Sequence, residues 1–328
     1  MVSQTLPITQ NSSVPLLLNP ASSGLFNGRA LMQTNFRNQN QFTTTYPYVT
    51  GVFDGQFRIG DKTIGEKDIF SVGGLAFYDN SNNGGFTQTQ LGGNIAYHKS
   101  LDEEGNLRLG AGFQINYRNC ILDYSKLSFA SQFNSSLGIY SSTVSGNPEG
   151  FGFSTSMYDW GAGIILSYAL DNVGYYLGVS GSNLNNPSAS KPGISVNLPR
   201  AFTYQGGIVL PTFEYDRLYA SLSHVTSASS NVTTLGFSYG FNLNGIDQEE
   251  DDELQIGSYL RFKDSYSPFV GIKKDNYFIG INYDVNISDQ ASINRGAGAL
   301  ELTMKILLRD NPNASNLKKL KCKFRFMW

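Results

Sequence analysis

Apolar and polar residues alternate along most of this chain, in stretches of about ten residues separated by turns rich in Asn, Asp, Ser and Gly. The clearest stretch runs from Leu107 to Tyr117, with Leu, Ala, Phe, Ile and Tyr on one face and Arg, Gly, Gln and Asn on the other. A period of two residues indicates a strand with one apolar and one polar face. A tilted strand of about ten residues can cross a bilayer, and closed sheets of such strands form barrels with a polar interior.

The alternation predicts about 14 strands, an even number as is usual for single-chain membrane barrels. The predicted fold is therefore an all-β, antiparallel, up-and-down transmembrane barrel at residues 28–308, flanked by an N-terminal segment (1–27) and a C-terminal segment (309–328). The expected strands are 28–38, 46–58, 67–79, 86–99, 106–119, 157–170, 173–182, 200–210, 215–226, 232–243, 254–263, 266–273, 276–287 and 297–308.

Composition supports the barrel over a soluble protein. Charged residues are only 15% of the 328 residues, whereas about a quarter is usual in soluble domains. The 35 Gly, 19 Tyr and 22 Phe residues suit a barrel wall with aromatic girdles. A soluble β-sandwich is the alternative, but its strands would be about five or six residues long. The net charge of -2 gives no electrostatic basis for binding nucleic acid.

Several features of the sequence indicate the cellular compartment of the protein. No run approaches the roughly eighteen apolar residues of a membrane helix, so a spanning structure must be a closed barrel, because open strand edges cannot face lipid. Residues Met1 to Pro7 lack the basic and apolar regions of a signal peptide, and we expect that one has been removed. The expected location is the bacterial outer membrane. Cys120 and Cys322 are expected at opposite ends of the barrel, without a disulfide.

The predicted connections alternate between two kinds. One set is short or charged, and the other is mostly uncharged, often longer and rich in Asn, Ser and Thr. Membrane barrels carry short turns on the periplasmic side and long loops outside. We therefore expect the first set and both termini in the periplasm, and the second set outside the cell. The longest connection, 118–156, is long enough to fold over or into the mouth, and loops of that length are usually functional.

Short motifs stand in a fixed order along residues 15–308, among them Asn19-Pro20-Ala21, Tyr158-Asp159-Trp160-Gly161 and Tyr283-Asp284. This order resembles the PorP/SprF family of type IX secretion system outer-membrane proteins. Asn40 stands where members often have Trp, Asn183 stands where they often have His, and the tail is longer and more basic. Both a core secretion component and a paralogue dedicated to one client therefore stay open. The motif residues are Asn19, Pro20, Ala21, Arg37, Gln39, Asp123, Ser125, Lys126, Leu127, Asp159, Gly161, Pro187, Tyr259, Arg261, Tyr283 and Asp284.

The resemblance implies a non-enzymatic barrel that works with the secretion and gliding machinery of the outer membrane. It also implies, for some members, pairing with a large secreted adhesin that carries a type-B C-terminal domain, which they export or hold on the cell surface. The expected partners are this adhesin, other type IX components and the lipid bilayer, with no cofactor. The alternative is a general porin or solute channel.

Six charged residues fall on the polar faces of predicted strands and are expected in the lumen or at its rim. A charge facing hydrocarbon costs roughly 2–4 kcal/mol at the midplane of the bilayer. We favour a salt-bridged lumen, and the functional alternative is a polar path or a docking surface for a client segment. These residues are Arg37, Asp159, Arg261, Asp284, Glu301 and Lys305.

Catalytic and metal sites are not expected. His98 and His224 fall near opposite ends of the predicted barrel and in no motif, whereas a hydrolase needs a nucleophile, a base and an orienting group together. The acidic run from Gln248 to Glu253 could bind calcium through its carboxylates. It lacks the glycine and the ligand spacing of a calcium loop, and we favour a solvated turn.

The two terminal segments each allow two interpretations. The stretch from Leu6 to Gly24 is too rich in Pro and Asn for a strand. It either forms a plug, which we slightly favour, or lies across the periplasmic opening. The basic tail from Leu317 to Trp328 ends in alternating aromatic residues. It is either a closing strand or a periplasmic arm that binds an acidic partner or anionic headgroups.

Overall fold

The computed structural model describes most of the chain, including all the strands of the barrel. The statements below refer to these residues. They are 8–40, 47–59, 67–81, 85–123, 126, 133–140, 153–170, 173–191, 194–212, 216–228, 230–243, 252–289, 291, 296 and 298–309.

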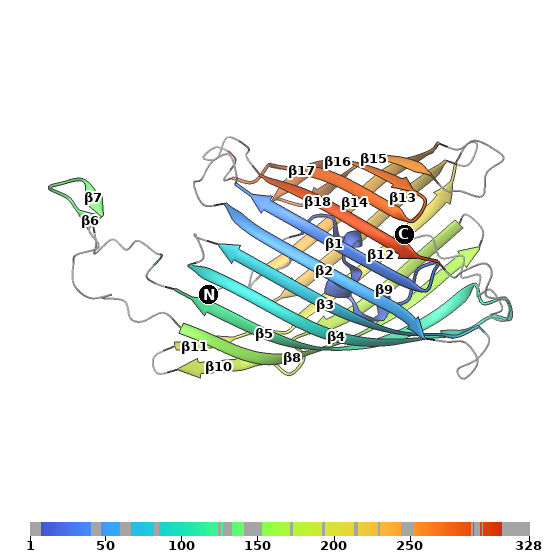
Figure 1. Ribbon diagram of the computed structural model, residues 1–328, viewed down its shortest axis with the longest axis horizontal. Helices are drawn as coiled ribbons and strands as arrows, with labels where there is room; N and C mark the ends of the chain where they lie inside the picture. The colour runs from blue at the N-terminus through green and yellow to red at the C-terminus, as the bar shows by residue number, and fades with distance from the viewer. Residues whose placement is uncertain are drawn as a thin grey trace.

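The described residues form a closed antiparallel 14-strand barrel. Figure 1 shows the strands tilted against the long axis of the barrel. The strands are β1 (Ala30–Gln39), β2 (Tyr48–Ile59), β3 (Ile69–Ser81), β4 (Phe86–Ser100), β5 (Leu107–Leu122), β8 (Phe153–Leu170), β9 (Val173–Ser182), β12 (Ala201–Pro211), β13 (Arg217–Ser227), β14 (Ser230–Asn242), β15 (Glu253–Arg261), β16 (Ser265–Lys274), β17 (Tyr277–Asn286) and β18 (Ala299–Leu308).

The barrel closes between its first and last strands. β1 pairs with β18 over its whole length, from Ala30 opposite Leu308 to Gln39 opposite Ala299. The predicted fold class is therefore confirmed. Most strand bounds lie within two residues of the predicted ones, but β5 ends at Leu122 rather than 119 and β8 begins at Phe153 rather than 157.

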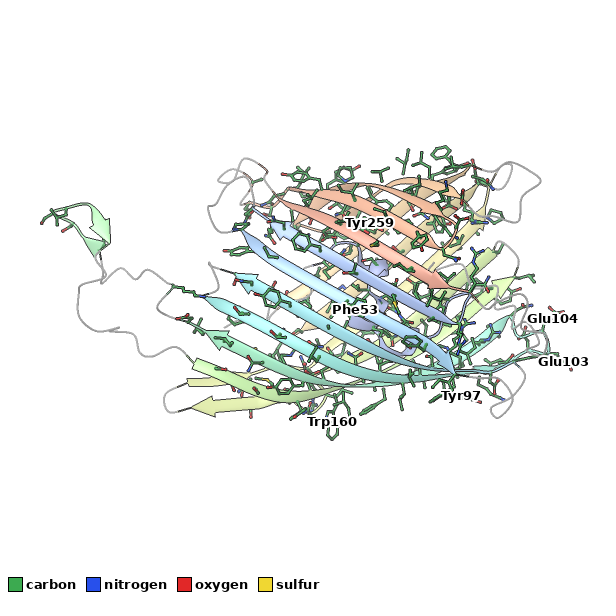
Figure 2. All side chains as sticks on the ribbon, in the orientation of Figure 1. Phe53, Tyr97, Glu103, Glu104, Trp160 and Tyr259 are labelled. Carbon is green, nitrogen blue, oxygen red and sulfur yellow. The ribbon has the colours of Figure 1, made fainter. Side chains whose placement is uncertain are left out.

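Four short strands lie in the connections between barrel strands. β6 (Phe133–Asn134) pairs with β7 (Ile139–Tyr140), and β10 (Ser188–Lys191) pairs with β11 (Ile194–Asn197). Figure 1 draws the β6–β7 hairpin clear of the barrel, beyond the end at which β5 finishes. We call this the loop end, and we call the opposite end, which carries the β4–β5 turn with Glu103 and Glu104, the turn end (Figure 2).

The wall of the barrel has an apolar exterior. On β5, Phe113 and Ile115 are exposed, while Gln114 and Asn116, which alternate with them, are buried. Figure 2 shows Trp160 projecting away from the wall. A band of exposed Leu, Ile, Phe and Tyr around a closed sheet is the surface that lipid solvates. No helix in the described residues is long and apolar enough to span a membrane.

The described residues before β1 lie inside the barrel, where Figure 1 shows them in dark blue. They form η1 (Asn11–Ser13), α1 (Pro15–Leu18) and η2 (Pro20–Ser22). Pro15 begins α1 at a position where its missing N–H is not needed, and Pro20 begins η2 in the same way. Apolar residues of this segment pack against inward side chains of the barrel in three small clusters. In one of these clusters, Val14 lies with Leu75 and Phe77 of β3. The segment therefore fills part of the lumen and covers apolar residues on the inner wall.

Candidate functional site

The motif Asn19–Gly24 holds the N-terminal segment to the inner wall. The Asn19 side chain accepts a hydrogen bond of 2.9 Å from the amide of Ala21, which caps η2. Its Nδ2 donates to the carbonyl of Ile164 on β8 at 3.2 Å. The Asn19 side chain thus both caps η2 and binds it to the wall of the barrel.

Polar side chains from other strands bind the rest of this motif. Asn94 on β4 donates to the carbonyl of Pro20 at 2.8 Å, and Gln205 on β12 donates to the hydroxyl of Ser22 at 3.1 Å. At Gly24, whose φ is +86°, the amide donates to Gln56 on β2 at 3.0 Å. The contacts come from several sides of the barrel, so the motif is fixed across the lumen.

Glycines on the inner wall leave the space that η2 occupies. A Cβ at Gly112 on β5 would lie 2.4 Å from the amide nitrogen of Ala21. A Cβ at Gly163 on β8 would lie 2.1 Å from the side-chain oxygen of Asn19. A Cβ atom essentially never lies this close to another atom, so a larger residue at Gly112 would displace the backbone of η2 and one at Gly163 would displace the Asn19 side chain.

A buried cluster of charges binds the other end of the segment. Arg37 on β1 forms ion pairs with Asp284 on β17 and Glu301 on β18. The amides of Thr9 and Gln10 donate to the two carboxylate oxygens of Glu301 at 2.7 and 3.1 Å. The Thr9 hydroxyl donates to Asp284 at 2.8 Å. The N-terminal segment thus supplies further donors to two buried carboxylates that already pair with Arg37.

The structure places the six candidate lumen charges in the buried interior. Arg261 reaches the same cluster through a 3.1 Å contact with the Thr9 hydroxyl. Lys305 donates to the carbonyl of Ser12 at 3.3 Å. Asp159 is apart from the cluster and pairs with Arg118 at 3.3 Å on the neighbouring strand.

The turn end is ordered by carboxylates that accept several hydrogen bonds. Asp68 accepts from Lys99 Nζ at 2.8 Å, from the Tyr97 hydroxyl at 2.5 Å and from the amide of Ser100 at 2.9 Å. Burial acts to raise the pKa of Asp68, but the hydrogen bonds from Lys99 and Tyr97 outweigh it and hold the pKa below its usual value. Asp68 is therefore ionised at neutral pH and joins β3 to β4.

The two histidines lie in different environments. His98 is buried in the lumen, with Nε2 2.7 Å from the carbonyl oxygen of Ser23. His224 lies on β13, with Nδ1 2.7 Å from the hydroxyl of Thr233 and its ring beside Tyr204. The structure does not bring them together. The described residues contain no group of His, Cys, Asp and Glu that could hold a metal.

The family model described as "Type IX secretion system membrane protein PorP/SprF" matches residues 2–306, nearly the whole chain. The chain belongs to the PorP/SprF family. This member is accordingly a membrane β-barrel of the type IX secretion system, and family and fold together support the outer membrane as its location. Its family and fold are those of a secretion protein rather than of a known enzyme class.

Other comparisons are more distant. No curated protein matches the sequence. The toluene transporter TodX of P. putida has a TM-score of 0.48 at 12% identity, over 90% of this chain and 94% of that chain. A Pseudomonas aeruginosa FadL homologue has a TM-score of 0.46 at 12% identity, over 88% and 92%. The KdgM porin has a TM-score of 0.40 at 6% identity, over 85% of this chain and 99% of that chain. These similarities are too distant to indicate a substrate or partner.

The remaining motif residues of this PorP/SprF member are dispersed along the barrel. Asp123 and Lys126 follow β5, with 4.0 Å between the carboxylate and Nζ. Pro187 accepts a backbone hydrogen bond of 3.0 Å from Leu198. Tyr259 packs edge-on against Phe269 with 5.7 Å between ring centroids. The other three lie on strands, Gln39 on β1, Gly161 on β8 and Tyr283 on β17.

Some predicted features lie outside the described residues, namely Ser125, Leu127, Cys322, the tail beyond 309 and the acidic run before Asp252. Within the described part of that run, Glu253 pairs with Arg217 at 3.3 Å. Sequence reasoning missed Thr9, Asn94 and Gln205 as contacts of the N-terminal segment. For Asn94 and Gln205, the only signal in the sequence is a polar residue at an inward strand position. Thr9 binds through its backbone amide as well as its side chain.

Proposed function

We propose that this barrel exports or anchors a secreted adhesin that carries a type-B C-terminal domain, and that the loop end faces out of the cell and binds it. Family membership is the observation that carries this proposal. The expected partners are the adhesin and other components of the type IX system.

The loop end offers an extended surface for such a partner. β5 has 16 residues and β8 has 18, against 10 in β1, β9, β16, β17 and β18. The connection between them carries the β6–β7 hairpin, where Leu137 is 68% exposed. Exposed backbone edges and apolar side chains on such loops suit a β-rich client, because a strand can be added to them.

We further propose that residues 8–26 act as a plug. Their burial in the lumen and their hydrogen bonds to the wall support this role. A plugged lumen favours a binding barrel over a general porin, since a porin conducts through an open, water-filled interior. The porin alternative would gain support from steady ion conductance of the intact protein in planar bilayers.

Deletion of residues 130–150 tests the binding surface. We expect the barrel to fold and reach the membrane, and the adhesin to appear in the medium instead of on the cells. Deletion of residues 188–197, the β10–β11 hairpin, is the matched control and should leave the adhesin on the surface. Adhesin that stays on cells with the 130–150 deletion would exclude this connection as the anchor.

A further inference from the structure

The lumen on the loop side of α1 contains a cavity, here called the vestibule. Its floor is formed by Leu17 and Leu18 of α1, and its wall includes inward residues of β3, β4, β5, β8 and β9. Leu75 and Phe77 on β3 continue the apolar floor. A concave site with an apolar base and a few polar groups is the usual form of a ligand pocket.

Two amide side chains of the vestibule wall lack partners. Gln88 and Gln90 lie on β4 and line the cavity. Gln90 is only 5% exposed, and neither side chain has a hydrogen-bond partner in the described part of the chain. Neither residue is among those with a fully buried, unpartnered amide atom, so both amides reach the open space of the cavity, where a ligand can bind them. By contrast, Gln114 on the next strand donates to Asn116 at 2.7 Å.

The charges of the vestibule compensate each other. Arg118 on β5 pairs with Asp159 on β8 at 3.3 Å, and Asn116 donates to the same carboxylate at 2.7 Å. No other charged side chain lines the described cavity. An ionic ligand would find no counter-charge here, so the vestibule suits an uncharged one.

From these observations we propose that the vestibule binds an extended, uncharged peptide segment of the exported protein. The amides of Gln88 and Gln90 can both donate to and accept from a peptide backbone, and the floor at Leu17 takes an aliphatic side chain. A sugar fits less well, because Phe77 is the only aromatic residue among the described lining residues and is 7% exposed. The proposal rests on the function proposed above and adds the place where the client inserts.

Site-specific photocrosslinking in growing cells tests the proposal. Benzoylphenylalanine is placed at Ser182, which lines the vestibule, at Leu137 on the β6–β7 hairpin, or at Gln255, which lines a different cavity. After irradiation, crosslinked peptides are identified by mass spectrometry. We expect the Ser182 probe to capture a segment without Asp, Glu, Lys or Arg from the C-terminal domain of one secreted protein, and the Gln255 probe to capture none.

The three positions separate the two proposals. Capture of the secreted protein at Leu137 but not at Ser182 would overturn the vestibule proposal and leave the proposed function standing. Capture of no secreted protein at either position would overturn both. Capture at Ser182 of a charged segment or of a glycan would overturn the proposed ligand class.

A second variant tests the role of the two amides. With the probe at Ser182, Q88A/Q90A should lower the crosslinked yield about thirtyfold, because two hydrogen bonds of roughly 1 kcal/mol each are lost. The control Gln255→Ala removes a lumen amide outside the vestibule, one that donates to Glu253 at 2.6 Å, and should leave the yield unchanged. Equal yields from Q88A/Q90A and the parent would overturn the assigned role of these amides.

Discussion

The amide of Thr9 donates a hydrogen bond of 2.7 Å to the carboxylate of Glu301, across 292 positions of the chain. The same carboxylate forms an ion pair with Arg37. Arg37 lies on β1 and Glu301 on β18, the two strands that close the barrel. One buried carboxylate therefore joins the closing seam of the barrel to the segment inside it.

Replacement of Glu301 by Ala should destabilise the barrel strongly. The change leaves Arg37 with the Asp284 carboxylate and takes away the acceptor of the Thr9 and Gln10 amides. Removing one partner of a buried ion pair lowers the free energy of unfolding by about 3–5 kcal/mol. Urea unfolding in detergent micelles, followed by gel mobility, measures the change. Lys126→Ala is the control, because Lys126 and its partner Asp123 are 47% and 36% exposed and surface pairs contribute about 0–1 kcal/mol. If both variants unfold at the same urea concentration, the cluster does not stabilise the barrel.

Substitution of Gly112 by Ala should loosen the N-terminal segment without opening the barrel wall. The added Cβ would lie 2.4 Å from the amide nitrogen of Ala21, so η2 must move away. Gly93→Ala is the matched control, because a Cβ there meets nothing within 4 Å. Hydrogen exchange measured by mass spectrometry should rise at residues 15–24 in the Gly112 variant alone. Unchanged exchange in that variant would mean that the segment does not depend on the contact.

The strands could be predicted because lipid on one side and a polar lumen on the other impose a period of two residues. The predicted start of β8 was wrong, because there the strand does not have lipid on one side and the lumen on the other. β8 begins at Phe153, and its first residues, Ser154, Thr155 and Ser156, are polar on both faces. A strand that extends beyond the bilayer has water on both sides, so no alternation marks it. β5 runs past its predicted end for a different reason, because its last residues Cys120, Ile121 and Leu122 are apolar on both faces and so show no alternation either.

The lumen charges could be predicted from the sequence because a charge on the lipid face is strongly unfavourable. Their partners could not. Glu301 binds the backbone amides of Thr9 and Gln10, and every residue except proline offers such an amide. Those amides reach Glu301 because the N-terminal segment folds back into the lumen, and no pattern of side chains in the sequence predicts that folding. Asn19 is different, because its side chain makes the contacts itself.

The stability of the turn end should depend on pH through Asp68. Its pKa is lowered in the folded protein, so the ionised carboxylate stabilises the fold above the unfolded pKa of about 3.9. This contribution is lost as the pH falls through the lower folded value. Asp68→Asn should therefore lower the urea midpoint at pH 7, and the difference from the parent should vanish toward pH 2. A difference that persists unchanged at low pH would show that the charge of Asp68 is not its cause.

Removal of residues 8–24 should convert the barrel into a conducting pore. The deletion takes away α1 and η2 and with them the contacts of Asn19, while all barrel strands remain. We expect the intact protein to show little ion conductance in planar bilayers and the deletion variant to show stable open channels. A heat-dependent shift in gel mobility first establishes that the variant is a folded barrel. Gly112→Ala, which keeps the segment but loosens it, should give brief openings. Equal conductance of the intact protein and the folded deletion variant would rule out a plug and favour the porin alternative.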